Sequence, residues 1–347
     1  MLIPEVQIAQ NSYDTETKKM FIVSEGFEKR SLYWISKKEN KTIFEKAIIC
    51  RYLPSKKSRF NEMYKLVKAH AINEPTILDY NRFEPTAFEQ HIKDNLSDLD
   101  DIDEIVIDIS VMSKLLIMII LCCLGNFNKK ITIIYSEPSS WGPTENKYKN
   151  IIANKTYGTC IGLSSVGVGD VVRTPMLSSI VMQDCPIYLV TFLSFNEQLI
   201  NVLMNEISPT KIHIINHKCS QEKWREDAML SIHQELIKET VGKDDFDVVS
   251  SYNLRDYKGV FEKISKIYKD NCYNYRIVVS PTGCKLHAVA CALLKLCCSD
   301  VHVEYPTPES YLFDDYSSEE VSNVYSIIFD NYKKTIQNIA TEYSLNG

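Results

Sequence analysis

The stretch IVVSPTGCK, Ile277–Lys285, decides how this chain folds. An apolar strand ends in a turn that contains two hydroxyl side chains and a glycine, and Lys285 then opens an apolar helix that reaches Leu296. Continuous apolar strands joined to apolar helices are typical of parallel sheets that are covered on both faces. The stretch therefore predicts an α/β fold.

Similar units recur along the whole chain in two parallel series. Phe27 corresponds to Phe195, 168 residues later, and Tyr80 corresponds to Tyr252, 172 residues later. Self-similarity at a nearly constant spacing indicates an internal repeat. The expected strands of the first series are 21–24, 47–52, 76–81, 105–108 and 131–135, and those of the second are 188–193, 211–217, 247–253, 277–280 and 301–305.

These series predict two tandem Rossmann-like parallel-sheet subdomains, related by internal duplication and followed by a C-terminal helix. We expect the first subdomain at residues 15–140 and the second at residues 186–312. Residues 141–185 form a glycine-containing bridge, which is either a mobile loop or a simple crossover. The tail, residues 313–347, is expected to be helical, with Val321, Val324, Ile327 and Ile328 on one face.

Composition excludes several classes of protein. The chain has 347 residues, a formal net charge of −6 and 45% hydrophobic residues, which argues against a protein that coats duplex DNA. The 11 cysteines show no metal-binding spacing, so we expect reduced thiols, no metal and no resident cofactor. The longest apolar run, Leu115–Leu124, is about half a membrane span. We therefore expect a cytoplasmic protein without a membrane partner.

Candidate ligand-binding residues follow from the topology, because open parallel sheets bind ligands beyond the carboxyl ends of their strands. Pseudo-symmetry is expected to bring the two sets of strand ends face to face or onto a shared edge. In the first half the candidates are Ser24, Arg30, Ser110 and Lys114. In the second half they are Thr191, Ser194, Asn196, Ser280, Thr282, Gly283, Lys285, Tyr305 and Glu309.

The strongest local signal is the turn from Ser280 to Lys285. Hydroxyl groups, a glycine and a lysine at the start of a helix together make an anion site, and phosphate is the natural ligand. The alternative is a capped helix with a solvated lysine. The turn matches neither the P-loop nor the GxGxxG pattern.

Three carboxylates are candidates for catalysis. Glu25 and Glu28 follow the first strand, and Asp108 ends the fourth. Paired carboxylates near a sugar serve glycosidic chemistry. The alternatives are acidic residues that favour a helix N-terminus for Glu25 and Glu28, and a helix cap for Asp108.

The strand, the turn Thr282-Gly283-Cys284-Lys285 and the buried helix resemble the signature of CRISPR-associated Rossmann fold (CARF) sensor domains. In that family the turn usually reads Thr-Gly-Gly-Thr-Lys. Thr282, Gly283 and Lys285 match it, and Cys284 stands in place of two residues. The resemblance implies a pair of domains around a cyclic oligonucleotide, in prokaryotic antiviral defence. A tandem duplication would supply that pair within one chain.

Three functions remain open at this point. The first is a nucleotide or cyclic-oligonucleotide sensor that acts through an effector protein or by self-association. Alternatively, the chain is a nucleotide-processing enzyme, either a metal-independent phosphodiesterase or an N-glycosidic hydrolase. The third possibility is a structural subunit with a decayed site.

Overall fold

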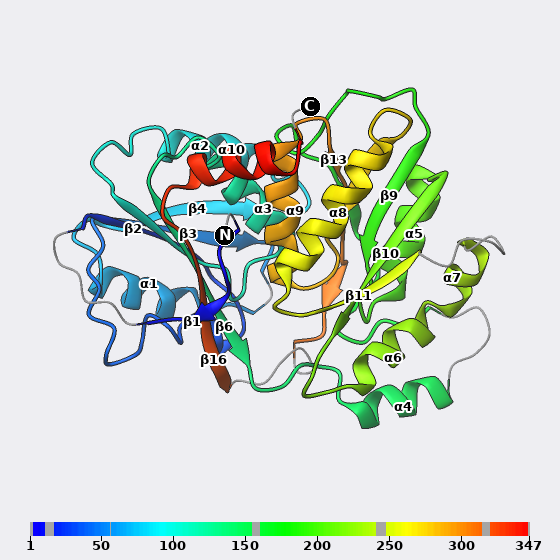
Figure 1. The fold of residues 1–347 in the computed structure, drawn as a ribbon. Coiled ribbons are helices and arrows are strands. Elements are labelled where there is room, and N and C mark those ends of the chain that lie inside the picture. Colours follow the sequence, from blue (N-terminus) through cyan, green and yellow to red (C-terminus); the bar gives the residue numbers. More distant parts are fainter. Residues whose placement is uncertain are drawn as a thin grey trace. The chain divides into compact units, whose positions relative to one another are not determined.

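The computed structural model describes residues 3–10, 17–55, 57–154, 160–240, 248–313 and 320–345. The chain divides into two compact units. Unit 1 consists of Met1–Ser140 and Ser317–Glu342, and unit 2 consists of Trp141–Tyr316 and Tyr343–Gly347. Both contain a parallel sheet with helices (Figure 1), which confirms the predicted α/β class.

Unit 1 is built on a seven-stranded sheet in the order β1-β16-β6-β5-β2-β3-β4. The five strands from β6 to β4 are parallel, whereas β16 and β1 add antiparallel pairs at one edge. Its elements are β1 (Gln7–Ile8), β2 (Lys19–Ser24), the 3-10 helix η1 (Lys29–Ser31), β3 (Lys46–Leu53), α1 (Phe60–Ala69), β4 (Thr76–Asn81), α2 (Thr86–Asn95), β5 (Glu104–Asp108), α3 (Lys114–Cys123), β6 (Lys130–Pro138), β16 (Val321–Phe329) and α10 (Tyr332–Glu342).

Unit 2 is built on a five-stranded parallel sheet in the order β11-β10-β9-β12-β13. Two short antiparallel pairs, β14 with β8 and β15 with β7, accompany it. Its elements are α4 (Glu145–Ala153), β7 (Ser165–Val166), β8 (Asp170–Val172), β9 (Ile187–Phe192), α5 (Glu197–Ile207), β10 (Lys211–Lys218), α6 (Trp224–Ile232), α7 (Gln234–Thr240), β11 (Val249–Asn253), α8 (Tyr257–Asn271), β12 (Arg276–Ser280), α9 (Lys285–Cys297), β13 (His302–Val303), β14 (Tyr305–Thr307) and β15 (Ser310–Tyr311).

The two parallel sheets share one strand order. We count only the strands of each parallel sheet, in chain order. In both sheets these strands then lie in the order third, second, first, fourth, fifth, as β4-β3-β2-β5-β6 in unit 1 and β11-β10-β9-β12-β13 in unit 2. This is the order of a doubly wound Rossmann-like sheet. The shared order agrees with the predicted repeat, and descent of both units from one duplicated sequence stays a prediction.

Apolar strand faces form the cores. In unit 2, Leu189 and Ile214 pack with Ile200 of α5 and Met229 of α6 on one face of the sheet. On the other face α8 and α9 lie side by side (Figure 1), and the Phe192 ring lies 5.8 Å from that of His287 in α9.

One face of the sheet in unit 1 is covered differently. Here Trp34, which follows η1, packs with Phe21, Phe44 and Met63 of α1. Unit 2 places the eleven-residue helix α5 directly after its first strand, whereas unit 1 places only the short η1 and a loop at this point.

The expectation of a fully helical tail is wrong. Residues 321–329 form strand β16, which pairs with β6 and β1, and only Tyr332–Glu342 is helical. The apolar spacing of Val321, Val324 and Ile327 fits a helix face, but these residues are β-branched and find an open sheet edge. Pairing with a distant strand therefore overrides the local pattern.

The expected fifth strand of the second half is only partly correct. His302 and Val303 join the parallel sheet, but Tyr305–Thr307 leaves it and pairs with β8. Since β8 and β7 come from the expected bridge, residues 141–185 contribute to the fold of unit 2 and are more than a crossover.

Some predicted features lie outside the described residues. They are the start of the first subdomain at residues 15 and 16, Gly158 of the bridge, residue 247 of an expected strand, and residues 314–319 and 346–347 of the tail.

Candidate functional site

Each parallel sheet has a switch point, where the connections after two neighbouring strands leave in opposite directions. It lies between β2 and β5 in unit 1 and between β9 and β12 in unit 2. Ligands of open α/β sheets bind outside the carboxyl ends of the strands at such points. Ser24 and Asp108 end the two strands of unit 1, and Thr191 pairs with Ser280 at the end of unit 2's strands. The predicted strand-end residues therefore fall at the expected edges.

In unit 2 the turn after β12 is tied to the end of β9. The Thr282 hydroxyl donates a hydrogen bond to the Phe192 carbonyl and accepts one from the Phe192 backbone N–H at 3.3 Å. The Thr191 hydroxyl oxygen lies 3.5 Å from the Thr282 hydroxyl oxygen. Thr282 was predicted to contact ligand, and in the structure it holds the two loops together.

Close approach of these loops requires a glycine. A Cβ atom on Gly283 would lie 2.8 Å from the Cβ of Phe192. In unit 1 the arrangement is similar, but the glycine is on the other loop, where a Cβ on Gly26 would lie 2.9 Å from that of Val111. At both switch points, therefore, the two loops touch at a position where only glycine fits.

Helix α9 begins at this turn, with Lys285 as its first residue. Its first intrahelical hydrogen bond runs from Ala288 N–H to the Cys284 carbonyl at 3.3 Å, and Cys284 provides no side-chain cap. In contrast, Ser113, Asn196 and Asp256 cap α3, α5 and α8 with their side chains. The N-terminus of α9 thus offers backbone donors and a positive dipole end at the switch point.

Ser280 is the last residue of β12 and precedes this helix terminus in the chain. Its side chain is fully buried, and its Oγ has no hydrogen-bond partner among the described residues. A buried hydroxyl without a partner is costly, at about 1–3 kcal/mol. Ser280 therefore has hydrogen-bonding capacity at the edge where a ligand is expected.

His287, in the first turn of α9, has a structural role. Its Nε2 lies 3.1 Å from the carbonyl of Asn253, and its side chain is 1% exposed. Burial lowers the pKa of His287 to about 4, so the ring is neutral near pH 7 and donates this hydrogen bond. The ring thus ties α9 to the end of β11.

Asn196 and Ser194 shape the loop after β9. Asn196 caps α5 by accepting from Gln198 N–H at 3.2 Å, and its amide donates to Ser165 Oγ at 3.0 Å. The Ser194 hydroxyl donates to the Asn196 carbonyl at 3.2 Å. Both side chains, predicted as ligand contacts, have these local partners.

The remaining two candidates of unit 2 lie outside the five-stranded sheet. Tyr305 is buried in β14, where it pairs with Val172. Glu309 is exposed and lies next to Gly167, whose Cβ position would be 2.6 Å from Glu309 Oε2.

In unit 1, four predicted residues form one network through Ser136. Arg30 Nη1 donates to the Ser136 carbonyl at 3.1 Å, and Ser136 N–H donates to Ser110 Oγ at 2.8 Å. Ser110 N–H in turn donates to Asp108 Oδ1 at 2.9 Å. Arg30 also binds Glu28 through two contacts of 2.5 and 3.0 Å. The sequence placed these residues at one edge but did not indicate their connection.

Within this network, Arg30 and Glu28 form a buried ion pair. The side chains of Arg30 and Glu28 are 3% and 8% exposed, so the pair is buried and its two charges cancel. Asp108 does not cap α3, since Ser113 does so by accepting from Leu116 N–H at 3.2 Å. Lys114 is the first residue of α3, as predicted. Ser24, at the end of β2, is fully buried with no hydrogen-bond partner for its Oγ within the described chain.

Glu25 belongs to a separate network. Its carboxylate accepts hydrogen bonds from Tyr52 N–H at 2.8 Å and from the Ser58 hydroxyl. Burial is the largest influence on the group and raises the pKa of Glu25, against the opposing effects of these hydrogen bonds and of Arg51. The sequence missed Tyr52 and Ser58, because nothing local shows that the end of β3 and the segment after it reach Glu25.

Burial also keeps several thiols protonated. It raises the pKa of Cys123 and Cys297 to about 12 and that of Cys50 and Cys291 further still. All cysteines in the described chain are free thiols. Buried, protonated thiols of this kind are poor nucleophiles.

The described residues lack two further features. No group of three or more His, Cys, Asp or Glu residues is arranged to hold a metal ion. No helix among them has the length and apolar character needed to cross a membrane.

Neither the protein-family models nor the curated protein sequences give a match to this chain.

The closed switch point of unit 2 makes Gly283→Ala a test of the fold. The new methyl group meets a Cβ that cannot move without its backbone, so we expect a loss of about 1–3 kcal/mol in the free energy of unfolding. Urea denaturation measures it. Lys266→Ala, on the exposed face of α8, is the control and should change stability by less than about 0.5 kcal/mol. A Gly283→Ala protein as stable as the wild type would contradict this packing.

Glu25→Gln tests the raised pKa of Glu25. A carboxyl group with a raised pKa binds more protons in the folded than in the unfolded chain, so its contribution to stability falls as pH rises above 4.5. Glutamine mimics the protonated form and lacks this titration. We therefore expect the variant to gain stability relative to wild type as pH rises through that range, in urea denaturation at several pH values. Exposed Glu39→Gln should run parallel to the wild type, and parallel behaviour of Glu25→Gln would refute the assignment.

Proposed function

We propose that this protein is a nucleotide-binding sensor, and that it holds a phosphate of its ligand at the carboxyl edge of the sheet in unit 2. The observation that carries the proposal is the turn from Ser280 to Lys285. This turn lies at the switch point between β9 and β12 and opens α9 without a side-chain cap.

The charge and geometry of the turn favour an anion. A helix N-terminus presents backbone N–H groups and the equivalent of about half a positive charge. Lys285, the first residue of the helix, adds a full charge at the same place. Gly283 lets the turn pack closely against β9, and the buried Ser280 hydroxyl adds a further hydrogen-bonding group.

A nucleotide fits this site better than a simple inorganic ion. Doubly wound sheets bind nucleotides at their switch points, because the diverging loops leave room for the base and sugar. The resemblance of the turn to CARF domains favours a cyclic oligonucleotide in particular, and with it a role in prokaryotic antiviral defence. In this proposal, ligand binding changes the contact with an effector protein or with a second copy of the chain.

An enzyme that cleaves an N-glycosidic bond is the second candidate. The raised pKa of Glu25 suits a general acid, which must be protonated near neutral pH. However, Glu25 already accepts hydrogen bonds from Tyr52 and Ser58, and Glu28 is paired with Arg30. Because both carboxylates already have these partners, the sensor is favoured over the enzyme.

Lys285→Gln tests the proposal. Because a charged hydrogen bond contributes about 1.5–3 kcal/mol, its removal should weaken nucleotide binding by about tenfold or more. Calorimetric titration with ATP, cyclic di-AMP and cyclic tetra-adenylate measures the affinity. Lys266→Gln, on the exposed face of α8, is the matched control and should bind like the wild type.

Chromatography of the nucleotide after each titration separates the two candidates. Recovery of intact ligand supports a sensor, and its consumption supports an enzyme. Equal affinity of wild type and Lys285→Gln would refute the assigned phosphate position, and the absence of binding by all three nucleotides at millimolar concentration would refute the proposed function.

A further inference from the structure

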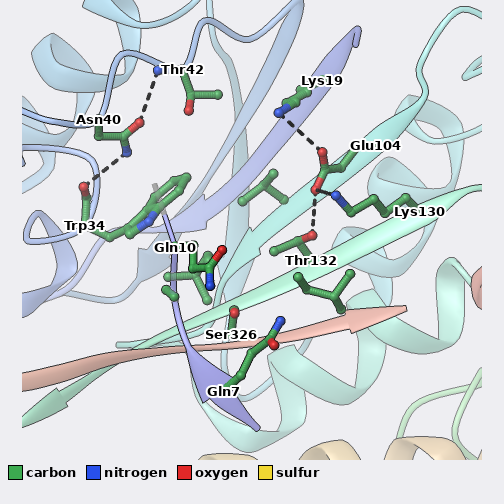
Figure 2. Close-up of a pocket in the computed structure, with 14 residues that line it drawn as sticks. Gln7, Gln10, Lys19, Trp34, Asn40, Thr42, Glu104, Lys130, Thr132 and Ser326 are labelled. Carbon is green, nitrogen blue, oxygen red and sulfur yellow. Dashed lines mark hydrogen bonds and ion pairs between the residues drawn. The ribbon is translucent and has the colours of Figure 1, made fainter. Parts of the chain in front are cut away.

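Unit 1 contains a cavity of about 230 Å³ on one face of its seven-stranded sheet. Figure 2 shows charged and polar side chains along its floor and Trp34 at its side. Lys19, Glu104 and Lys130 are the first residues of β2, β5 and β6. The cavity therefore lies toward the amino ends of these strands, at the opposite end from the switch point of the same sheet.

The connection after β2 contains no long helix, and this explains why the face is hollow. Unit 2 has the long helix α5 after its first strand, whereas unit 1 has η1 and a loop that carries Trp34 and Asn40. The loop is held by Asn40, whose amide donates to the Trp34 carbonyl at 3.1 Å. It covers Phe21 and Phe44, and the cavity remains over the neighbouring strands β5, β6 and β16.

The floor of the cavity carries a net charge of about +1. Glu104 lies 3.4 Å from the Lys19 ammonium and 3.2 Å from the Lys130 ammonium, and it accepts from the Thr132 hydroxyl at 2.6 Å. Glu104 is the one side-chain partner of both ammonium groups within the described residues. An ammonium group has three donors, so both lysines retain donors that Glu104 does not use.

Lys19 is unusual because its charge is buried. Its side chain is 5% exposed, and that of Lys130 is 38% exposed. Buried charges are stable only when paired and hydrogen-bonded. One carboxylate shared between two ammonium groups leaves room for a second anion.

Trp34 supplies a second, independent indication of a ligand. The side chain lines the cavity and is 7% exposed, and its indole Nε1 has no hydrogen-bond partner in the described part of the chain. A buried N–H without a partner costs about 1–3 kcal/mol, which an acceptor atom of a bound molecule would offset. Val106, Ile134 and Ile328 line the same cavity and give it an apolar wall.

We propose that this cavity binds a small organic acid with one carboxylate group. The carboxylate accepts from the ammonium groups of Lys130 and Lys19, the apolar body packs against Val106, Ile134 and Ile328, and Trp34 Nε1 donates to an acceptor of the ligand. This site is independent of the nucleotide site proposed in unit 2.

Size and charge select this class of ligand. The volume is below the roughly 300–1,000 Å³ typical of drug-sized ligands, so a molecule with one ring or a short chain fits and a dinucleotide does not. The single net positive charge matches a carboxylate rather than a phosphate dianion. Among the described residues that line the cavity there is no arginine, the residue best suited to bidentate phosphate recognition.

Calorimetric titration of the full chain with benzoate tests the proposal, with neutral benzamide and inorganic phosphate as comparison probes. We expect benzoate to bind at least about tenfold more tightly than either, since one charge-assisted hydrogen bond accounts for such a factor. Equal binding of benzamide, tighter binding of phosphate, or no binding of benzoate at millimolar concentration would each overturn the proposal.

Two variants test whether the probe binds in this cavity. Lys130→Gln should weaken benzoate binding by about tenfold or more. Trp34→Phe, which keeps the ring but removes the N–H, should weaken by several-fold the binding of 4-hydroxybenzoate, whose hydroxyl supplies the second acceptor. Lys65→Gln, on the exposed face of α1, is the matched control and should leave the affinity unchanged. Unchanged benzoate affinity of Lys130→Gln together with unchanged 4-hydroxybenzoate affinity of Trp34→Phe would overturn the site. Because Trp34→Phe leaves the charges of the floor intact, it serves as the test if Lys130→Gln does not fold.

Discussion

The hydrogen-bonded pairing of the first and fourth parallel strands is the constraint on which each unit depends. The pairs are β2 with β5 and β9 with β12, and their connections leave the sheet in opposite directions. The loops after the two strands must therefore pass each other closely before they diverge. Gly26 against Val111 and Gly283 against Phe192 make this approach possible.

This packing decides which polar groups remain available for function. Thr282 bonds to Phe192 across the switch point, and Glu28 and Arg30 neutralise each other. These side chains stabilise the loops, so their presence at a strand end does not make them ligand contacts. Each switch point keeps one buried serine hydroxyl, Ser24 or Ser280, but only in unit 2 does the following helix, α9, lack a side-chain cap, and this is why the proposed phosphate position lies in unit 2.

Much of the fold could be predicted from the sequence, because buried parallel strands have short, continuous apolar patterns. The helices that begin at Lys114 and Lys285 start where expected. The strand at 321–329 could not be predicted in this way, since an edge of β6 far away in the sequence determines its conformation. Local apolar spacing carries no information about such a partner.

The candidate site was predictable in position but not in its contacts. Strand ends can be located from apolar runs, whereas the network from Glu28 through Ser136 to Asp108 depends on how η1 meets the ends of β5 and β6. The cavity in unit 1 had a weak signal in the sequence. Lys19, Glu104 and Lys130 are charged residues directly before apolar strand segments, and they resemble ordinary solvated strand ends until Glu104 is seen to be buried.

Backbone hydrogen exchange in the first turn of α9 tests the central claim most directly. If the N–H groups of this turn bind a phosphate, their exchange should slow when the full chain is given saturating cyclic tetra-adenylate or ATP, while exchange in the exposed C-terminal turn of α8 stays the same. Unchanged exchange at Leu286 and His287 with millimolar nucleotide would contradict the account.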